Sequence, residues 1–147
     1  MVFRTAYRIT GNAADAEDVL QTVFLRLLRR EAGARSLENE ESYLRRAAIN
    51  ASLDVLRAQR TTPTAELDEL LSSSNRDSLE LRQVLARALA RLKPRSAEVF
   101  ALRFLEGLDN ARIAEMLGIS RVLVAVIAHR ARQQLRKELG WYLGDRS

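Results

Sequence analysis

The sequence predicts an all-α protein of two small helical domains joined by a flexible linker, the second a helix-turn-helix domain. Hydrophobic residues make up 47% of the 147 residues and aromatic residues only 5%, a composition that favours helix over strand. Apolar residues recur at spacings of three and four without strand-like alternation. An acidic segment that combines Pro63 with several Thr and a serine run is typical of a linker and divides the chain. The predicted boundaries are 1–60 for the first domain, 61–80 for the linker and 81–147 for the second domain.

Charge is distributed unevenly along the chain. The net charge is +5; residues 1–60 contribute +2, residues 61–80 contribute −4 and residues 81–147 contribute +7. A strongly basic domain suggests a polyanionic partner. The acidic linker would be repelled by a phosphate backbone, so we expect the basic domains to make any contact with nucleic acid.

The composition also excludes several classes of site. The chain has no Cys, and His129 is its one His, which excludes disulfides, thiol catalysis, cysteine-built zinc sites and histidine metal clusters. There is no Gly-rich phosphate loop, and the acidic residues follow helix-end or surface patterns. We therefore expect no catalytic residue, no metal site, no cofactor and no enzymatic activity. No apolar run approaches the roughly 20 residues of a membrane span, and the N-terminus lacks a signal-peptide pattern, so a cytoplasmic protein is expected.

In the first domain, the main helix is predicted to follow the turn at Gly11-Asn12. Its apolar residues are expected to form one face: Ala16, Val19, Leu20, Val23, Phe24, Leu27 and Leu28. Acidic residues early in this helix and arginines near its end complement the helix dipole. Gly33 is predicted to end the helix, and Ser42 to cap a second helix that runs from Tyr43 to about Arg60. Residues 2–9 resemble only the last turns of an earlier helix.

The second domain contains the most informative stretch. After an amphipathic helix from about residue 81 to 92, Pro94 fits the first position of a helix that Gly107 ends. Ala114 then supplies the small residue that a helix-turn-helix needs where its helices cross, and Gly118 supplies the turn. Apolar contacts are expected from Ile113, Leu117, Ile119, Val124 and Ile127. Ser120 would cap the second helix, whose first half would enter the major groove. An ordinary helical hairpin is the alternative, but the filled offsets and the basic charge favour DNA binding.

These residues carry a resemblance to a known family. Leu92–Arg95, Val99–Phe104, Ile113–Ser120 and His129–Arg132 resemble region 4 of the extracytoplasmic-function (ECF) sigma factors, which reads the −35 promoter element. Asp15–Gln21 with Phe24 resembles the region 2 signature that docks on the clamp of core RNA polymerase. Tyr43-Leu44, Ile49-Asn50 and the residues that follow them resemble the helix that engages the −10 element. The resemblance implies a transcription initiation factor with core RNA polymerase and promoter DNA as partners, and an anti-sigma factor as a further candidate.

The resemblance also implies three sets of binding residues. Polymerase binding is expected from Asp15, Glu17, Asp18 and Gln21. Binding of the −10 region is expected from Arg46, Asn50, Asp54, Arg57 and Arg60, of which the first four share one helical stripe. Binding of the −35 region is expected from Ser120, Arg121, His129, Arg130, Arg132 and Arg136. Without the resemblance, the stripe is typical of a solvated helix face and the acidic cluster of dipole partners. The resemblance further implies that the polar loop 31–41 would take up an unstacked base of melted promoter DNA.

The sequence departs from the family pattern at several positions. Ala125 and Ile127 stand where the family usually has cations, so we expect weaker or altered −35 recognition, with apolar side chains touching thymine methyl groups. Arg112 replaces a common Glu, although Asp109 can still cap that helix. The first helix is expected to be truncated relative to the family.

Two other functions stay open at this point. One is a helix-turn-helix regulator that binds DNA without recruiting polymerase. The other is a degenerate sigma-like protein-interaction module, which the apolar residues Val122, Ala125 and Val126 motivate. The acidic cluster Asp15–Gln21 distinguishes a sigma factor from both.

Overall fold

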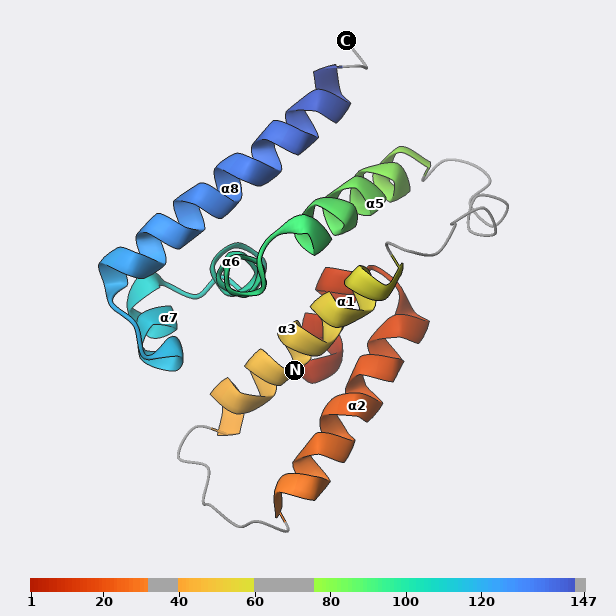
Figure 1. The fold of residues 1–147 in the computed structure, drawn as a ribbon. Coiled ribbons are helices and arrows are strands. Elements are labelled where there is room, and N and C mark those ends of the chain that lie inside the picture. Colours follow the sequence, from red (N-terminus) through yellow and green to blue (C-terminus); the bar gives the residue numbers. More distant parts are fainter. Residues whose placement is uncertain (32–39, 60–75, 145–147) are drawn as a thin grey trace.

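The computed structural model describes residues 1–31, 40–59 and 76–144, and every regular element in these ranges is helical (Figure 1). This confirms the predicted all-α class. In chain order the elements are α1 (Val2–Thr10), α2 (Ala13–Glu31), α3 (Glu40–Gln59), α5 (Arg76–Arg91), α6 (Pro94–Phe100), the π-helical turn η1 (Ala101–Leu105), α7 (Asn110–Leu117) and α8 (Arg121–Gly144).

Helices α1, α2 and α3 pack against one another and form the first unit. Gly11 ends α1 in the left-handed conformation at φ 67°, and its N–H donates to the Tyr7 carbonyl over 2.8 Å. That turn is why α2 can fold back beside α1. Asn12 Oδ1 then accepts from the Asp15 N–H over 3.1 Å and caps the start of α2. The interior of this unit is built from small residues: Ala6, Ala16, Val19, Val23, Ala48 and Ala51.

The second unit consists of α5, α6, η1, α7 and α8. Pro94 begins α6 as predicted, because its missing N–H falls where a helix leaves donors unpaired. After η1 the chain turns at Gly107, whose φ is 73°, and enters α7. The long helix α8 packs on α5, α6 and α7 and covers their shared apolar surface.

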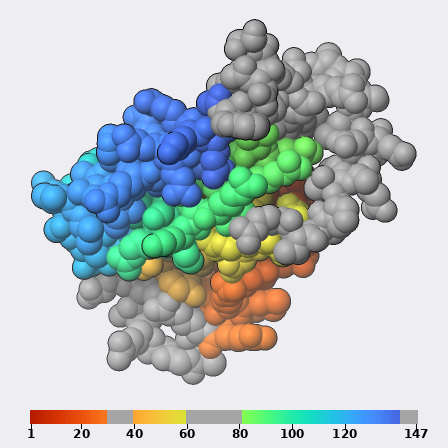
Figure 2. Space-filling view, turned by 45° about the horizontal axis from the view of Figure 1, so that its top comes forward, coloured from red at the N-terminus to blue at the C-terminus, as the bar shows by residue number. Residues whose placement is uncertain are grey.

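The two units share one apolar core. Large aliphatic side chains of the first unit, Ile9, Ile49, Leu53 and Leu56, are buried in the same cluster as residues of the second unit that include Leu89, Leu92, Val99 and Phe100. In the space-filling view the green surface of α5 lies directly against the yellow surface of α3 (Figure 2). The larger apolar residues of α3 are therefore covered by the second unit.

The structure corrects three details of the sequence prediction. Ser42 does not cap α3, because the helix already begins at Glu40 and Ser42 lies buried in its first turns. The helix α5 begins at Arg76, so residues 76–80 of the predicted linker are helical. Leu20, Phe24 and Leu28 of α2 are exposed and do not join the apolar face that is buried.

Other sequence predictions lie outside the described residues. These are Arg60, Gly33, most of the polar loop 31–41 and most of the linker. None of the helices in the described ranges has both the length and the hydropathy that a membrane span requires.

Candidate nucleic-acid and protein interfaces

The turn between α7 and α8 has the local structure that the sequence predicted. Asp109 Oδ1 accepts from the Arg112 N–H over 2.8 Å and caps α7. Gly118 ends α7 in the left-handed conformation, at φ 67° and ψ 35°. Ala114 is buried at the crossing, and its carbonyl accepts from the Ile119 N–H over 3.1 Å. The result is a short helix, a glycine turn and a longer helix, as in a helix-turn-helix.

The start of α8 presents its polar groups to solvent. Ser120 Oγ accepts from the Leu123 N–H over 3.0 Å and caps the helix. Val124 is fully buried and anchors the helix to the rest of the unit, as expected. The basic residues assigned to the −35 region are all exposed along α8: Arg121, His129, Arg130, Arg132 and Arg136. The guanidinium of Arg132 also lies 5.4 Å from the centre of the Phe104 ring.

An apolar patch interrupts these charges. Val122, Leu123, Ala125 and Val126 are exposed on the first two turns of α8, and we call them the apolar α8 surface. Val122 is 74% exposed and has exposed apolar neighbours, so these side chains form a contiguous patch, which is more informative than scattered single residues. The surface lies where a recognition helix would meet base edges. It can contact methyl groups but offers no side-chain donor or acceptor.

A mixed acidic and apolar surface runs along α2. Glu17, Asp18 and Gln21 are exposed, whereas Asp15 is half-buried and accepts from Gln59 Nε2 over 2.7 Å. Beside them lie four exposed apolar residues that sequence reasoning either placed in the core or left out: Leu20, Phe24, Leu25 and Leu28. Phe24 is 57% exposed. The signal was present, because Leu20, Phe24 and Leu28 recur every four residues and form a stripe of their own beside the buried Ala16, Val19 and Val23.

Two residues of the α3 stripe assigned to the −10 region contact the second unit. Arg46 Nε donates to Glu98 Oε2 over 3.1 Å, and Arg46 Nη2 donates to Glu98 Oε1 over 3.3 Å. Asn50 Nδ2 donates to the same Glu98 Oε2 over 2.7 Å. Farther along the stripe, Arg57 pairs with Asp54 of its own helix over 3.3 Å. The structure thus brings Arg46 and Asn50 together on one carboxylate that the sequence analysis did not connect to them.

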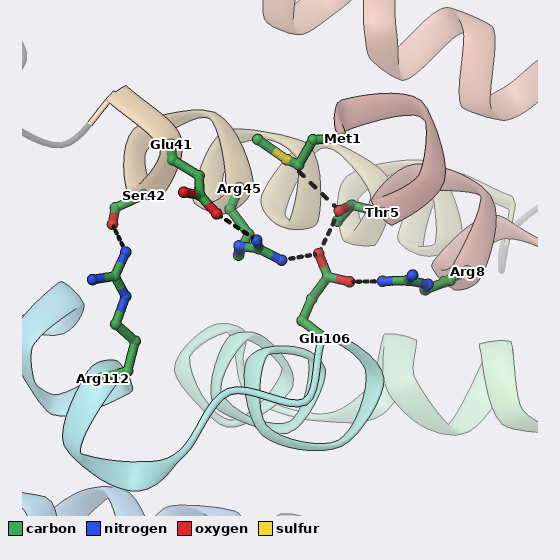
Figure 3. Close-up of polar contacts among 8 residues, drawn as sticks. All are labelled: Met1, Thr5, Arg8, Glu41, Ser42, Arg45, Glu106 and Arg112. Carbon is green, nitrogen blue, oxygen red and sulfur yellow. Dashed lines mark hydrogen bonds and ion pairs between the residues drawn. The ribbon is translucent and has the colours of Figure 1, made fainter.

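A second carboxylate joins the units in the same way (Figure 3). Glu106 follows η1, and its side chain is only 1% exposed. It accepts from the Thr5 hydroxyl, from Arg8 Nη1 over 2.5 Å and from Arg45 Nη1 over 2.9 Å. We call these four residues the Glu106 cluster. All three donors belong to the first unit, whereas Glu106 belongs to the second.

The Glu106 cluster extends to the surface through Arg45. Arg45 Nη2 donates to Glu41 Oε1 over 2.8 Å, and this hydrogen bond together with the arginine charge holds the pKa of the Glu41 carboxyl below its ordinary value of 4.5. Nearby, Arg112 Nη2 donates to Ser42 Oγ over 3.4 Å (Figure 3). Arg112, which stands where the family commonly has Glu, therefore contacts the first unit in this chain. Within the described ranges, no group of three or more acidic or His side chains is arranged to hold a metal ion.

Comparison with known proteins assigns both units. The family described as sigma-70 region 2 matches residues 1–62, and the family described as sigma-70 region 4 matches residues 82–135. The RNA polymerase sigma-E factor of Streptomyces avermitilis is 31% identical over 140 residues, which cover 94% of this chain and 78% of that protein. The ECF RNA polymerase sigma factor SigM of Mycobacterium tuberculosis is 31% identical over 139 residues, which cover 94% of this chain and 71% of that protein.

Proposed function

The chain belongs to the ECF group of RNA polymerase sigma factors, which act in transcription initiation, and we propose that three of its surfaces carry the contacts of that function. The surface of α2 binds core RNA polymerase, the stripe on α3 binds the −10 region, and the exposed face of α8 binds the −35 region. The observation that carries this proposal is that regions 2 and 4 follow one another in order on one chain.

The α2 surface suits a protein partner better than DNA. Its acidic residues would repel phosphates, and its apolar stripe of Leu20, Phe24 and Leu28 would remain in water without a partner. An apolar centre with a polar rim is typical of protein interfaces. We therefore assign polymerase binding to Glu17, Asp18 and Gln21 together with this stripe, and Asp15 to the edge of the surface.

The α3 and α8 surfaces suit nucleic acid. Arg46 and Asn50 offer a planar guanidinium fork and an amide, which can hold a phosphate and read an unpaired base. On α8, Arg121, Arg130 and Arg136 are exposed on one long helix that Ser120 caps, so their guanidinium groups are available to contact DNA phosphates.

Sigma factors are generally non-enzymatic, and we propose that this chain likewise makes no covalent change itself. Its partners would place it in the cytoplasm, where polymerase and promoters are found. Both points follow from the family rather than from a feature of the fold.

The test is run-off transcription with core polymerase on promoter libraries, with and without the chain. A variant combining Asp18→Lys with Gln21→Ala should lose polymerase capture and transcription but keep its affinity for duplex DNA. A matched variant, Glu115→Lys with Gln133→Ala, makes the same changes on exposed positions of the second unit and should retain polymerase capture. If core polymerase is never retained at any ionic strength, polymerase recruitment is wrong.

Two alternative functions make different predictions, and the apolar α8 surface favours the second of them. If the chain binds duplex DNA but not polymerase, it is a helix-turn-helix regulator. If it binds neither and retains a protein partner through Val122 and Val126, it is a protein-interaction module of sigma descent. The same capture and duplex-binding measurements separate these outcomes.

A further inference from the structure

We propose that copies of this chain associate head to tail, with the α2 surface of one copy docked on the apolar α8 surface of the next. The association follows from the two surfaces alone and requires neither polymerase nor DNA. Its consequence rests on the proposed function. A copy engaged through α2 cannot bind core polymerase, and a copy engaged through α8 cannot bind the −35 region.

Both surfaces are apolar helix faces that lie in water. The large apolar residues of the α2 surface are each between 40% and 57% exposed: Leu20, Phe24, Leu25 and Leu28. Those of the apolar α8 surface are each between 38% and 74% exposed: Val122, Leu123 and Val126. Contiguous exposed apolar groups of this kind mark interaction surfaces, because burial against a partner removes them from water.

The charges beside the two surfaces are opposite in sign. Glu17 and Asp18 are exposed next to the apolar residues of α2, whereas Arg121 and Arg130 are exposed next to those of α8. None of these four side chains forms an ion pair with another described residue. Pairing α2 with α2 would bring carboxylates together, and pairing α8 with α8 would bring guanidinium groups together. Only the pairing of α2 with α8 places opposite charges across the contact.

The spacing of acidic, basic and apolar residues also matches. On α2, Phe24 follows Glu17 by seven residues, and on α8, Arg130 follows Leu123 by seven residues. Seven residues are two helical turns, so the members of each pair lie on one helix face, about 10 Å apart. When the two helices run antiparallel, one register therefore places Phe24 against Leu123 and Glu17 against Arg130. Both the apolar contact and the ion pair are satisfied together.

The partner of each surface must come from a second copy. Helix α2 packs on α1 and α3, whereas α8 packs on α5, α6 and α7, and the two helices lie on opposite sides of the molecule (Figures 1 and 2). Each contact leaves one α2 surface and one α8 surface free, so further copies can add unless a ring closes. A single pair of helices buries a small interface, and the association is therefore weak and depends on concentration.

The test is analytical ultracentrifugation of the full chain, from about 5 to 500 μM, because a weak association appears only as the protomer concentration rises. Phe24→Lys places an ammonium group in the apolar centre of the α2 surface, and Val122→Lys does so in the apolar α8 surface. Both side chains are exposed, so the fold should not depend on them. Leu81→Lys is the matched control, since Leu81 is an exposed leucine of α5 outside both surfaces. Circular dichroism verifies that each variant retains its helices.

We expect the unmodified chain and Leu81→Lys to grow in mass with concentration, and Phe24→Lys and Val122→Lys each to associate at least about tenfold more weakly. An equal mixture of these two variants should form a dimer and nothing larger. The intact α8 surface of one variant meets the intact α2 surface of the other, and the two remaining surfaces both carry the added Lys. If the unmodified chain stays monomeric, the self-association is wrong. If either variant associates like Leu81→Lys, or the mixture forms no dimer, the pairing of α2 with α8 is wrong.

Salt and core polymerase test the charges and the consequence. Raising NaCl from about 50 to 300 mM should weaken the association, because salt screens the attraction between opposite charges. A stronger association in salt would indicate a contact between like-charged surfaces and contradict the pairing. Core polymerase added to fluorescently labelled chain should dissociate the assemblies into complexes with one chain each. If polymerase binds the assemblies without dissociating them, the mutual exclusion is wrong. If it binds no form of the chain, the proposed polymerase recruitment fails, whereas the masses measured without polymerase still decide the self-association.

Discussion

The two surfaces proposed to bind DNA, on α3 and on α8, are surrounded very differently. On α3 the polar residues Arg46 and Asn50 are already paired, and the apolar residues beside them are buried by the second unit. On α8 the cations are exposed, and so are the aliphatic residues Val122 and Val126. Arg46 and Asn50 on α3 thus already have a partner within the chain, whereas the α8 surface faces solvent.

The difference shows that residue type alone does not identify a contact surface. Both helices combine Arg with aliphatic side chains, yet one set of aliphatic side chains stabilises the fold and the other does not. Experiments that separate stability from binding should therefore give opposite results on the two helices.

The largest difference is expected in stability. Leu53 of α3 is fully buried between the units, so Leu53→Ala should lower the free energy of unfolding by about 2–5 kcal/mol through reduced burial and a cavity. Val122→Ala on α8 should change it by less than about 0.5 kcal/mol, because that side chain is already in water. Urea denaturation followed by circular dichroism measures both. Equal effects would mean that the two helices are not covered as differently as their surroundings indicate.

The next largest effect is expected in duplex affinity, through phosphate contacts that we propose for α8. Arg121→Ala and Arg130→Ala should each weaken duplex binding and reduce the slope of log affinity against log salt by about 0.9 for each phosphate that the variant no longer neutralises. Arg4→Ala removes the same charge from the first unit and should leave the slope nearly unchanged. Fluorescence anisotropy across a series of NaCl concentrations measures both quantities. An unchanged slope for both α8 variants would mean that this helix does not lie against the duplex.

A smaller effect on duplex affinity would show whether the apolar α8 surface contacts thymine methyl groups. If Val122 and Val126 read thymine methyl groups, replacing a contacted thymine by uracil removes only that methyl and should cost about 0.8 kcal/mol, or about fourfold in affinity. Replacement of thymines flanking the selected site is the control. In Val122→Ser, the same uracil substitution should have less effect. If contacted and flanking thymines respond alike, the apolar α8 surface has another partner.

The parts of the fold that the sequence predicted well are those set by local interactions. Asp109, Gly118 and Ser120 act within four residues of their own positions, so their spacing alone indicated the caps and the turn. The register of α2 was only partly predictable. Seven apolar residues spanned more of the helix circumference than one core could bury, and periodicity could not say which stripe would face inward.

The contacts between the two units could not be predicted because they join residues that are distant in the chain. Glu98 lies 52 residues from Arg46, and Glu106 lies 98 residues from Arg8. Each carboxylate sits among helix-forming residues, where an acidic residue is ordinary. Only the packing of α3 on the second unit brings these groups together, and that packing depends on the tertiary structure as a whole.

The smallest expected effect concerns the edge of the α3 face, where Arg45 lies between the exposed Glu41 and the buried Glu106. Because the pKa of Glu41 is lower in the folded chain than its ordinary value of 4.5, the pair stabilises the fold above that pH. This stabilisation is lost as the pH falls through the lowered pKa. It should be small, since Glu41 is exposed and screened by solvent.

Nuclear magnetic resonance titration of the Glu41 carboxyl should show the lowered pKa in the unmodified chain and a return toward 4.5 in Arg45→Gln. The exposed Glu115, on α7, provides a reference signal in the same spectra. A Glu41 pKa that does not respond to Arg45→Gln would mean that Arg45 does not bridge the two carboxylates. The Glu106 cluster would then end at Arg45 and would not extend to the exposed Glu41.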